Sequence, residues 1–165
     1  MNSNEIQERQ NKEIALKVQY AARVCFNSAE KNNHFAWIAC LVSAFSVFFP
    51  SGWSIYIING IPGFADVMAF LFGQLTSRKV SQASMLRKYF DSYVLDIQVD
   101  QFSESELRKI REQTEKIYEH NLLDGTTQIT NTGYDSPPGV RDWYVFQKDY
   151  EGIDAQFECQ RQNTW

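Results

Sequence analysis

Residues 35–75 form a 41-residue segment with one charged side chain, Asp66, and 28 of its other 40 residues are apolar. The chain as a whole is 22% charged, so a segment with so few charges is typical of one that lies in an apolar environment and not in water. A single membrane-spanning helix needs about 20 apolar residues. The length of the segment therefore predicts a transmembrane hairpin of two helices joined by a turn.

The first helix of this hairpin is expected over residues 35–49, because a proline and a glycine directly after it break the helix. The second helix can run over residues 53–75 with a kink at Pro62, or begin at Pro62 after an interfacial segment over residues 50–61. Asp66 favours the later start, because near a helix N-terminus its carboxylate meets the positive end of the helix dipole. At a deeper position, Asp66 would be a functional carboxylate facing a cavity or a partner helix.

The hairpin divides the chain into three parts, with residues 1–34 and 76–165 as its flanks. Lys and Arg lie in both flanks near the hairpin, and none lies in the connector between the two spans. The positive-inside rule then places both flanks in the cytoplasm. The first flank predicts one amphipathic helix over residues 4–33, with Asn4 as the N-cap and Gln7 completing a capping box.

The pattern of the second flank, residues 76–165, predicts a helical module with one loop. Apolar periodicity and turn residues predict helices over residues 77–97, 103–121 and 142–163, and a loop over residues 122–139. Ser103 and Glu106 form a capping box at the start of the middle helix. The predicted fold class is therefore all-α: a membrane protein with a two-helix transmembrane hairpin and a cytoplasmic helical bundle.

Composition excludes several classes of function. The net charge of −4 provides no basic field for a DNA or RNA polymer. The three cysteines are far apart and odd in number, which argues against a disulfide framework. Asp91, Asp96 and Asp100 place at most two carboxylates on one helix face, too few for a hard cation. No catalytic motif is present, so we expect no enzyme activity, no cofactor and no metal.

The densest group of ligand-binding residue types lies late in the chain, in VRDWY at 140–144 and QRQNTW at 160–165. Arginine can bind a phosphate or a carboxylate with two hydrogen bonds, and an aromatic ring can stack on a base. The candidate ligand-binding residues are Arg141, Trp143, Tyr144, Gln160, Arg161 and Asn163. The alternative is structural: the arginines pair with carboxylates inside a helical bundle and the aromatic rings fill its core.

Four short motifs resemble those of the SMODS-associated four-transmembrane effector family of bacterial conflict systems. IQERQN at 6–11 resembles its "I-x-x-R-Q-N" opening, and VRDWY at 140–144 resembles "V-R-x-W-Y". CQRQNTW at 159–165 resembles "C-Q-R-x-N-x-W". RKYFD at 87–91 resembles "Q-E-x-F-D", with Arg87 and Lys88 where Gln and Glu are usual. The hairpin at 35–75 corresponds to the first pair of spans of that family.

The resemblance implies a membrane effector in antiphage defence, encoded beside nucleotidyltransferases that make cyclic or linear oligonucleotide signals. It also implies a second pair of spans, which this sequence does not reach before Trp165. The expectation is either a truncated product or a two-span protomer that works as a homo-oligomer. The implied partners are the lipid bilayer of the bacterial inner membrane, further copies of the chain, and an oligonucleotide signal.

The leading hypothesis is thus an effector that perturbs the inner membrane when activated. The alternative is a membrane-anchored sensor or scaffold without pore or catalytic activity, because a two-span hairpin has few polar groups to line a water path. An enzyme acting through Arg141 and Arg161 is disfavoured, since no general base or nucleophile has a positioned partner. A protein that buries the apolar segment as a central helical hairpin away from any membrane is a further alternative.

Overall fold

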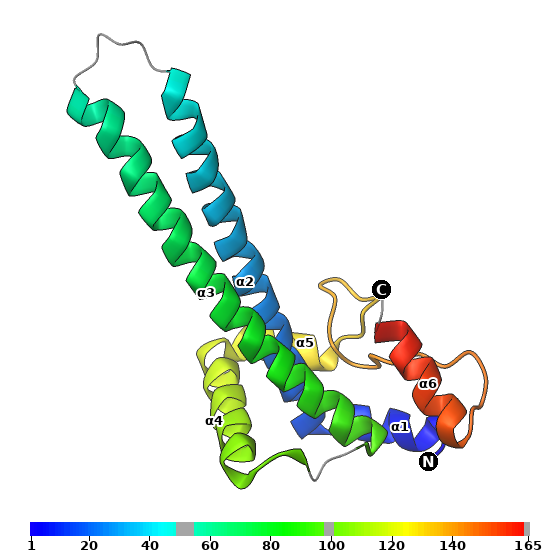
Figure 1. Ribbon diagram of the computed structural model, residues 1–165. Helices are drawn as coiled ribbons and strands as arrows, with labels where there is room; N and C mark the ends of the chain where they lie inside the picture. The colour runs from blue at the N-terminus through cyan, green and yellow to red at the C-terminus, as the bar shows by residue number, and fades with distance from the viewer. Residues whose placement is uncertain (49–54, 98–100, 164–165) are drawn as a thin grey trace. The chain divides into compact units, whose positions relative to one another are not determined.

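The computed structural model describes residues 1–48, 55–97 and 101–163, which form helices and irregular segments and, within those ranges, no strand (Figure 1). The helices are α1 (Ser3–Gln10), α2 (Glu13–Phe45), the short 3-10 helix η1 (Ser46–Phe48), α3 (Ile55–Leu95), α4 (Glu104–His120), α5 (Leu122–Thr130) and α6 (Gly152–Asn163). Two compact units are present: unit 1 contains residues 1–24 and 84–165, and unit 2 contains residues 25–83. The all-α prediction is confirmed.

The N-terminal flank is two helices and not the single predicted helix. Asn2, rather than Asn4, caps α1: its side chain accepts a hydrogen bond from the Glu5 amide, and the Glu5 carboxylate accepts one from the Asn2 amide. The helix ends at Gln10, and α2 starts at Glu13. The prediction of one helix over residues 4–33 was wrong because Asn11, the C-cap residue of α1, bonds to a distant segment through its side chain.

The second helix of the hairpin begins at Ile55 and continues without interruption to Leu95. The favoured start at Pro62 was therefore wrong, and the earlier start is nearer to the structure. Pro62 lies within the first turns of α3, where a proline removes one intrahelical hydrogen bond. Asp66 consequently lies about three turns into the helix, beyond the N-terminal turn in which the dipole stabilises a carboxylate.

In unit 2, the α2 and α3 segments lie side by side. The rings of Phe35 and Phe72 stack with centroids 5.4 Å apart, and the Thr76 hydroxyl lies 3.5 Å from the Ala29 carbonyl oxygen. Large apolar side chains nevertheless remain exposed on both helices: Phe35, Trp37, Ile38, Leu41, Val42 and Phe45 on α2, and Ile61, Phe64, Val67, Phe70, Leu71 and Leu75 on α3. We call this set the apolar surface of unit 2. Asp66 is exposed among these residues.

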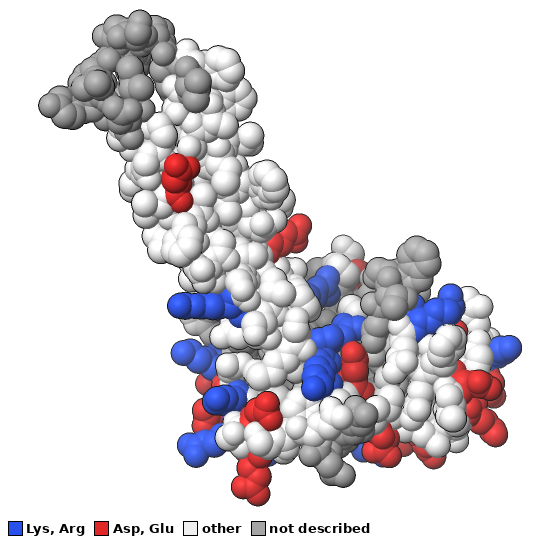
Figure 2. Space-filling view, in the orientation of Figure 1, with Lys and Arg blue, Asp and Glu red and all other residues white. Residues whose placement is uncertain are grey.

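The hairpin carries few charges on the face shown in Figure 2, whereas Lys, Arg, Asp and Glu cover unit 1 on that face. Within residues 35–75 the structure contains two α-helical segments. The first ends with α2 at Phe45, before the predicted residue 49, and the second is the part of α3 over residues 55–75. Residues 49–54 lie outside the described ranges. Within residues 1–48, 55–97 and 101–163, no helix combines the length and the sustained apolarity that crossing a bilayer requires.

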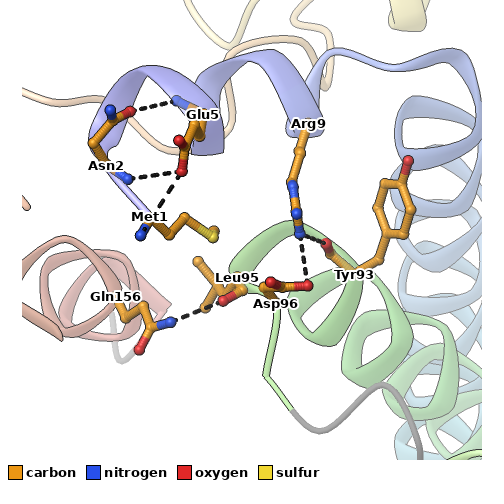
Figure 3. A network of polar contacts seen from close by, with 8 residues as sticks. All are labelled: Met1, Asn2, Glu5, Arg9, Tyr93, Leu95, Asp96 and Gln156. Carbon is orange, nitrogen blue, oxygen red and sulfur yellow. Dashed lines mark hydrogen bonds and ion pairs between the residues drawn. The ribbon is translucent and has the colours of Figure 1, made fainter. Parts of the chain in front are cut away.

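In unit 1, side chains from α1 and α6 bind the C-terminal end of α3 (Figure 3). Arg9 donates to the Tyr93 carbonyl oxygen at 3.3 Å and pairs with the Asp96 carboxylate at 2.9 Å. Gln156 donates to the Leu95 carbonyl oxygen at 3.0 Å. The last carbonyl groups of a helix have no partner within the helix, so these bonds stabilise the end of α3. The helix stops before the predicted residue 97 because Asp96 adopts a left-handed conformation with φ of 55°.

The capping box of Ser103 and Glu106 is present at the start of α4, as predicted. The predicted loop over residues 122–139 was wrong for its first half, which is helix α5. A Cβ atom on Gly125 would lie 2.8 Å from the Tyr118 ring and 3.2 Å from the Tyr20 ring. This glycine therefore permits close packing of α5, and it does not mark a turn.

The last predicted helix, over residues 142–163, was also only partly correct, because α6 begins at Gly152. Residues 131–151 are irregular apart from isolated bridges. Asp142 has a φ of 51°, which is incompatible with an α-helix. The segment around Asp142 is instead held by side chains from three helices, and those side chains build the candidate site.

Candidate functional site

Residues 140–145 form the centre of the candidate site. Val140 and Tyr144 are buried, whereas Arg141, Trp143 and Val145 are exposed. Val140 packs in the core of unit 1 with Leu16, Tyr20, Val24, Ile117, Tyr118 and Ile129. The segment therefore inserts some side chains into the core while it presents the others at the surface.

The end of α1 binds the backbone of this segment through two neighbouring side chains. The Gln10 side-chain amide donates to the Tyr144 carbonyl oxygen at 3.1 Å, and the Tyr144 amide donates to Gln10 Oε1 at 2.8 Å. Asn11 donates to the Asp142 carboxylate at 2.7 Å and accepts from the Asp142 amide at 3.1 Å. Gln10 and Tyr144 are both buried, so these bonds satisfy backbone groups that water cannot reach.

Helix α3 binds the aromatic side chains of the same segment. The Tyr144 hydroxyl donates to the Asp91 carboxylate at 2.6 Å, and the Tyr144 ring lies 6.1 Å from the Phe90 ring. The Arg87 guanidinium lies 3.5 Å from the Asp91 carboxylate and 4.4 Å from the centre of the Trp143 ring. Tyr144, predicted as a ligand-binding residue, is thus fully enclosed and contributes to packing.

Helix α6 contacts the C-terminal end of the segment, at Val145. Gln162 accepts from the Val145 amide at 3.1 Å and donates to the Val145 carbonyl oxygen at 2.8 Å. Arg161 donates twice to the Glu158 carboxylate, at 2.6 and 2.9 Å, and this contact raises the pKa of Arg161. Burial, together with nearby carboxylates, raises the pKa of the Cys159 thiol to about 12. All three cysteines are free.

Beside the segment lies an open hollow of about 460 Å³. Its lining consists of Gly133, Tyr134, Gly139, Arg141, Asp142, Trp143, Val145, Gln147, Glu158, Arg161 and Gln162. Three of the predicted ligand-binding residues, Arg141, Trp143 and Arg161, therefore lie together at one surface. Gln160 is exposed but does not line the hollow, and the side chain of Asn163 lies outside the described part of the chain.

The hollow presents both hydrogen-bond donors and acceptors. The Arg141 guanidinium forms no hydrogen bond or ion pair with the residues described in the structure, whereas the Arg161 guanidinium is bonded to Glu158. Asp142 and Glu158 contribute acceptors. An anionic ligand with a planar ring and donor groups of its own would suit this arrangement. Within the described ranges, no group of three or more His, Cys, Asp or Glu residues is placed to hold a metal ion.

Several residues of the site were not among the predicted site residues. Gln10, Asn11, Asp91 and Gln162 bind the central segment. The only signal for them in the sequence is their place in the motifs at 6–11, 87–91 and 159–165. Residues of the first two motifs, together with Gln162 of the last motif, contact the VRDWY segment and Val145 at residues 140–145.

The family described as the SMODS-associating 4TM effector domain matches residues 4–165. The chain belongs to that family. No curated protein and no solved structure matches the chain. The resemblance expected from the four motifs is confirmed, and the family assignment supports a role as an effector in SMODS-associated antiphage signalling. In this family member, the motifs far apart in sequence form one contact network within unit 1.

Proposed function

We propose that the chain is a membrane-embedded effector of a bacterial nucleotide-signalled antiphage defence system, and that it perturbs the inner membrane on activation. The observation that carries this proposal is the apolar surface of unit 2. Phe64 is 69% exposed and Phe70 is 66% exposed, and each would gain about 1.5–3 kcal/mol on full burial. Monomeric soluble proteins rarely expose apolar patches larger than a few hundred Å², so this surface requires an apolar environment.

A bilayer is the environment that fits the family, whose description names transmembrane segments. Lys31 before the hairpin and Arg78 and Lys79 after it favour a cytoplasmic location for both flanks. Trp37, 63% exposed, suits an interfacial position. Asp66 on the hairpin favours contact with further copies of the chain, because an isolated carboxylate in lipid is costly. We therefore propose a homo-oligomer in the inner membrane.

Vesicle binding and leakage test the membrane part of this proposal. Phe64→Asp with Phe70→Asp should abolish co-flotation of the protein with liposomes and the release of an enclosed dye. The matched control is Leu123→Asp, a residue of unit 1 that is 88% exposed and should tolerate the same change. Flotation without leakage in any condition would favour the membrane-anchored scaffold. Absence of flotation in the unchanged protein would refute a membrane location.

The second part of the proposal places the oligonucleotide signal in the hollow of unit 1. Arg141 would bind a phosphate, and Trp143 would contact a base. Asp142 and Glu158 would accept hydrogen bonds from amino groups of a base. This part is supported by the position of Arg141 and Trp143 on one hollow.

Calorimetric titration with cyclic and linear oligonucleotides tests the signal. Arg141→Gln should weaken binding by about tenfold or more, because one charge-assisted contact is lost. Arg108→Gln is the control, since Arg108 is an exposed arginine on α4 whose partner is Glu112. Equal affinity in the two variants would remove Arg141 from the site, and dye release that needs no oligonucleotide would argue against a signalled effector.

A further inference from the structure

Unit 1 contains a second cavity, of about 500 Å³, at a different place from the hollow. Helices α2, α3 and α4 form it, through Glu13, Ile14, Lys17, Val18, Tyr89, Leu107, Ile110, Arg111, Thr114 and Glu115. None of these residues belongs to the contact network around residues 140–145. Cavities of about 300–1,000 Å³ are the usual size for small-molecule sites.

The interior of this cavity is apolar. Val18 and Ile110 are almost fully buried, and Ile14 and Leu107 complete an aliphatic wall. Tyr89 contributes an aromatic surface that is fixed by contacts with the Phe102 and Tyr93 rings, at 5.7 and 6.2 Å. Ile14 is 44% exposed although Ala15, Leu16 and Val18, which follow it in the first turns of α2, are buried. The cavity therefore offers an aliphatic and aromatic surface that the described chain leaves partly open.

Thr114 lines the cavity, and its side chain carries a hydroxyl that has no hydrogen-bond partner among the described residues. Thr114 is 3% exposed, and its hydroxyl makes no hydrogen bond with any described residue. Buried polar groups in native proteins are nearly always hydrogen-bonded, and each exception requires an explanation. The hydroxyl oxygen is itself enclosed by protein, so the cavity presents a mainly apolar interior to a ligand.

Of the charged side chains at the rim, three form ion pairs with one another and one does not. Lys17 lies 3.0 Å from the Glu13 carboxylate and 3.5 Å from the Glu115 carboxylate, so both acids at the rim are engaged by one lysine. The Arg111 guanidinium forms no ion pair or hydrogen bond with the residues that the structure describes. The rim therefore retains one guanidinium that is available to an anion.

We propose that this cavity binds an amphiphilic carboxylate, meaning an aliphatic chain or ring that ends in one carboxylate. The apolar body lies against Ile14 and Leu107, and the carboxylate binds Arg111, whose fork geometry suits a carboxylate. This site is independent of signal binding in the hollow and of membrane perturbation, so either proposal can fail without the other.

Photo-crosslinking of the full chain in lipid nanodiscs tests the site. The probe is dodecanoate with a diazirine on its chain, and the matched neutral probe is the corresponding diazirine dodecanol. Mass spectrometry of the digested protein should find dodecanoate adducts on the peptides of α2 and α4 that line the cavity. The alcohol should label these peptides about tenfold less at equal concentration, because it cannot pair with Arg111.

Two variants make the test specific. Leu107→Trp fills the cavity and should abolish the adducts, whereas Leu123→Trp, on the exposed face of α5, should leave them unchanged. Arg111→Gln alters only an exposed side chain and should reduce dodecanoate labelling about tenfold without reducing that of the alcohol. Circular dichroism confirms that each variant is folded. Equal labelling by the two probes, or labelling that persists in Leu107→Trp, would overturn the proposal.

Discussion

Replacing Gln10 with methionine tests whether the contact between α1 and residues 140–145 stabilises unit 1. Methionine is unbranched and similar in size to glutamine, so Gln10→Met removes two hydrogen bonds without opening a large cavity. The Tyr144 amide and carbonyl would then lose these two bonds at a place that water does not reach, because Gln10 is 1% exposed and Tyr144 is fully buried.

An unpaired buried backbone group costs about 1–3 kcal/mol. Loss of the two bonds to Gln10 makes the expected decrease in the free energy of unfolding about 2–6 kcal/mol, a large part of the 5–15 kcal/mol typical of a domain. Gln7→Met introduces the same side chain at an exposed position of the same helix. It should change stability by less than about 0.5 kcal/mol.

Urea unfolding of the detergent-solubilised protein, followed by circular dichroism, measures the change in the free energy of unfolding for each variant. Hydrogen exchange of the Tyr144 amide supplies a local readout, since that amide is protected by the 2.8 Å bond to Gln10. Exchange should accelerate in Gln10→Met and remain slow in Gln7→Met. If the two variants unfold at the same urea concentration and the Tyr144 amide stays protected in both, the contact does not stabilise the unit as argued.

Two further changes test the loop and helix α5. Gly125→Ala should destabilise unit 1 by about 1–3 kcal/mol, because the added Cβ would overlap the Tyr118 ring. This cost should exceed the gain from the better helix propensity of alanine. Gly133→Ala, with open space around its Cβ, is the control in the same thermal melt. The Thr132 amide and hydroxyl hold the pKa of Asp135 below its ordinary value of 3.8, so its contribution to stability is present above that value and is lost as the pH falls below it. Asp135→Asn should flatten the pH dependence of the melting temperature between about pH 5 and 2, and an unchanged slope would contradict this.

The elements that the sequence predicts well are those specified by neighbouring residues. The start of α4 follows from Ser103 and Glu106, three residues apart, which satisfy each other's backbone groups whatever the rest of the chain does. The buried face of the predicted helix over 77–97 follows from Leu86, Phe90 and Val94, whose spacing alone puts them on one side.

The elements that it predicts poorly depend on distant partners. Asp124 and Gly125 have the composition of a turn, yet Asp124 accepts a hydrogen bond from the Tyr20 hydroxyl at 2.9 Å, and α5 continues through both residues. Gln10 and Tyr144 are 134 positions apart, so no local pattern can pair them. Of the candidate ligand residues, Arg141, Trp143 and Arg161 lie at one hollow, but only the fold shows that Tyr144 between them is enclosed.

The orientation of the chain in a membrane needs a labelling site other than its natural thiols. Cys25 and Cys159 lie in the flanks, but they are 1% and 0% exposed. Because the thiolate is the reactive form, a pKa of about 12 makes Cys159 unreactive at neutral pH. A membrane-impermeant maleimide would therefore leave both unlabelled on either side of the membrane, and a negative result would carry no information on topology.

Leu123→Cys supplies the missing probe, because position 123 is 88% exposed and lies in unit 1. If both flanks are cytoplasmic, as the distribution of Lys and Arg predicts, this thiol should resist the impermeant maleimide in intact spheroplasts. It should then be labelled after the inner membrane is permeabilised. Cys40 is exposed on α2 within the predicted first span, so lipid should protect it until detergent is added. Labelling of Leu123→Cys in intact spheroplasts would reverse the predicted orientation, and labelling of Cys40 there would argue against insertion of that helix.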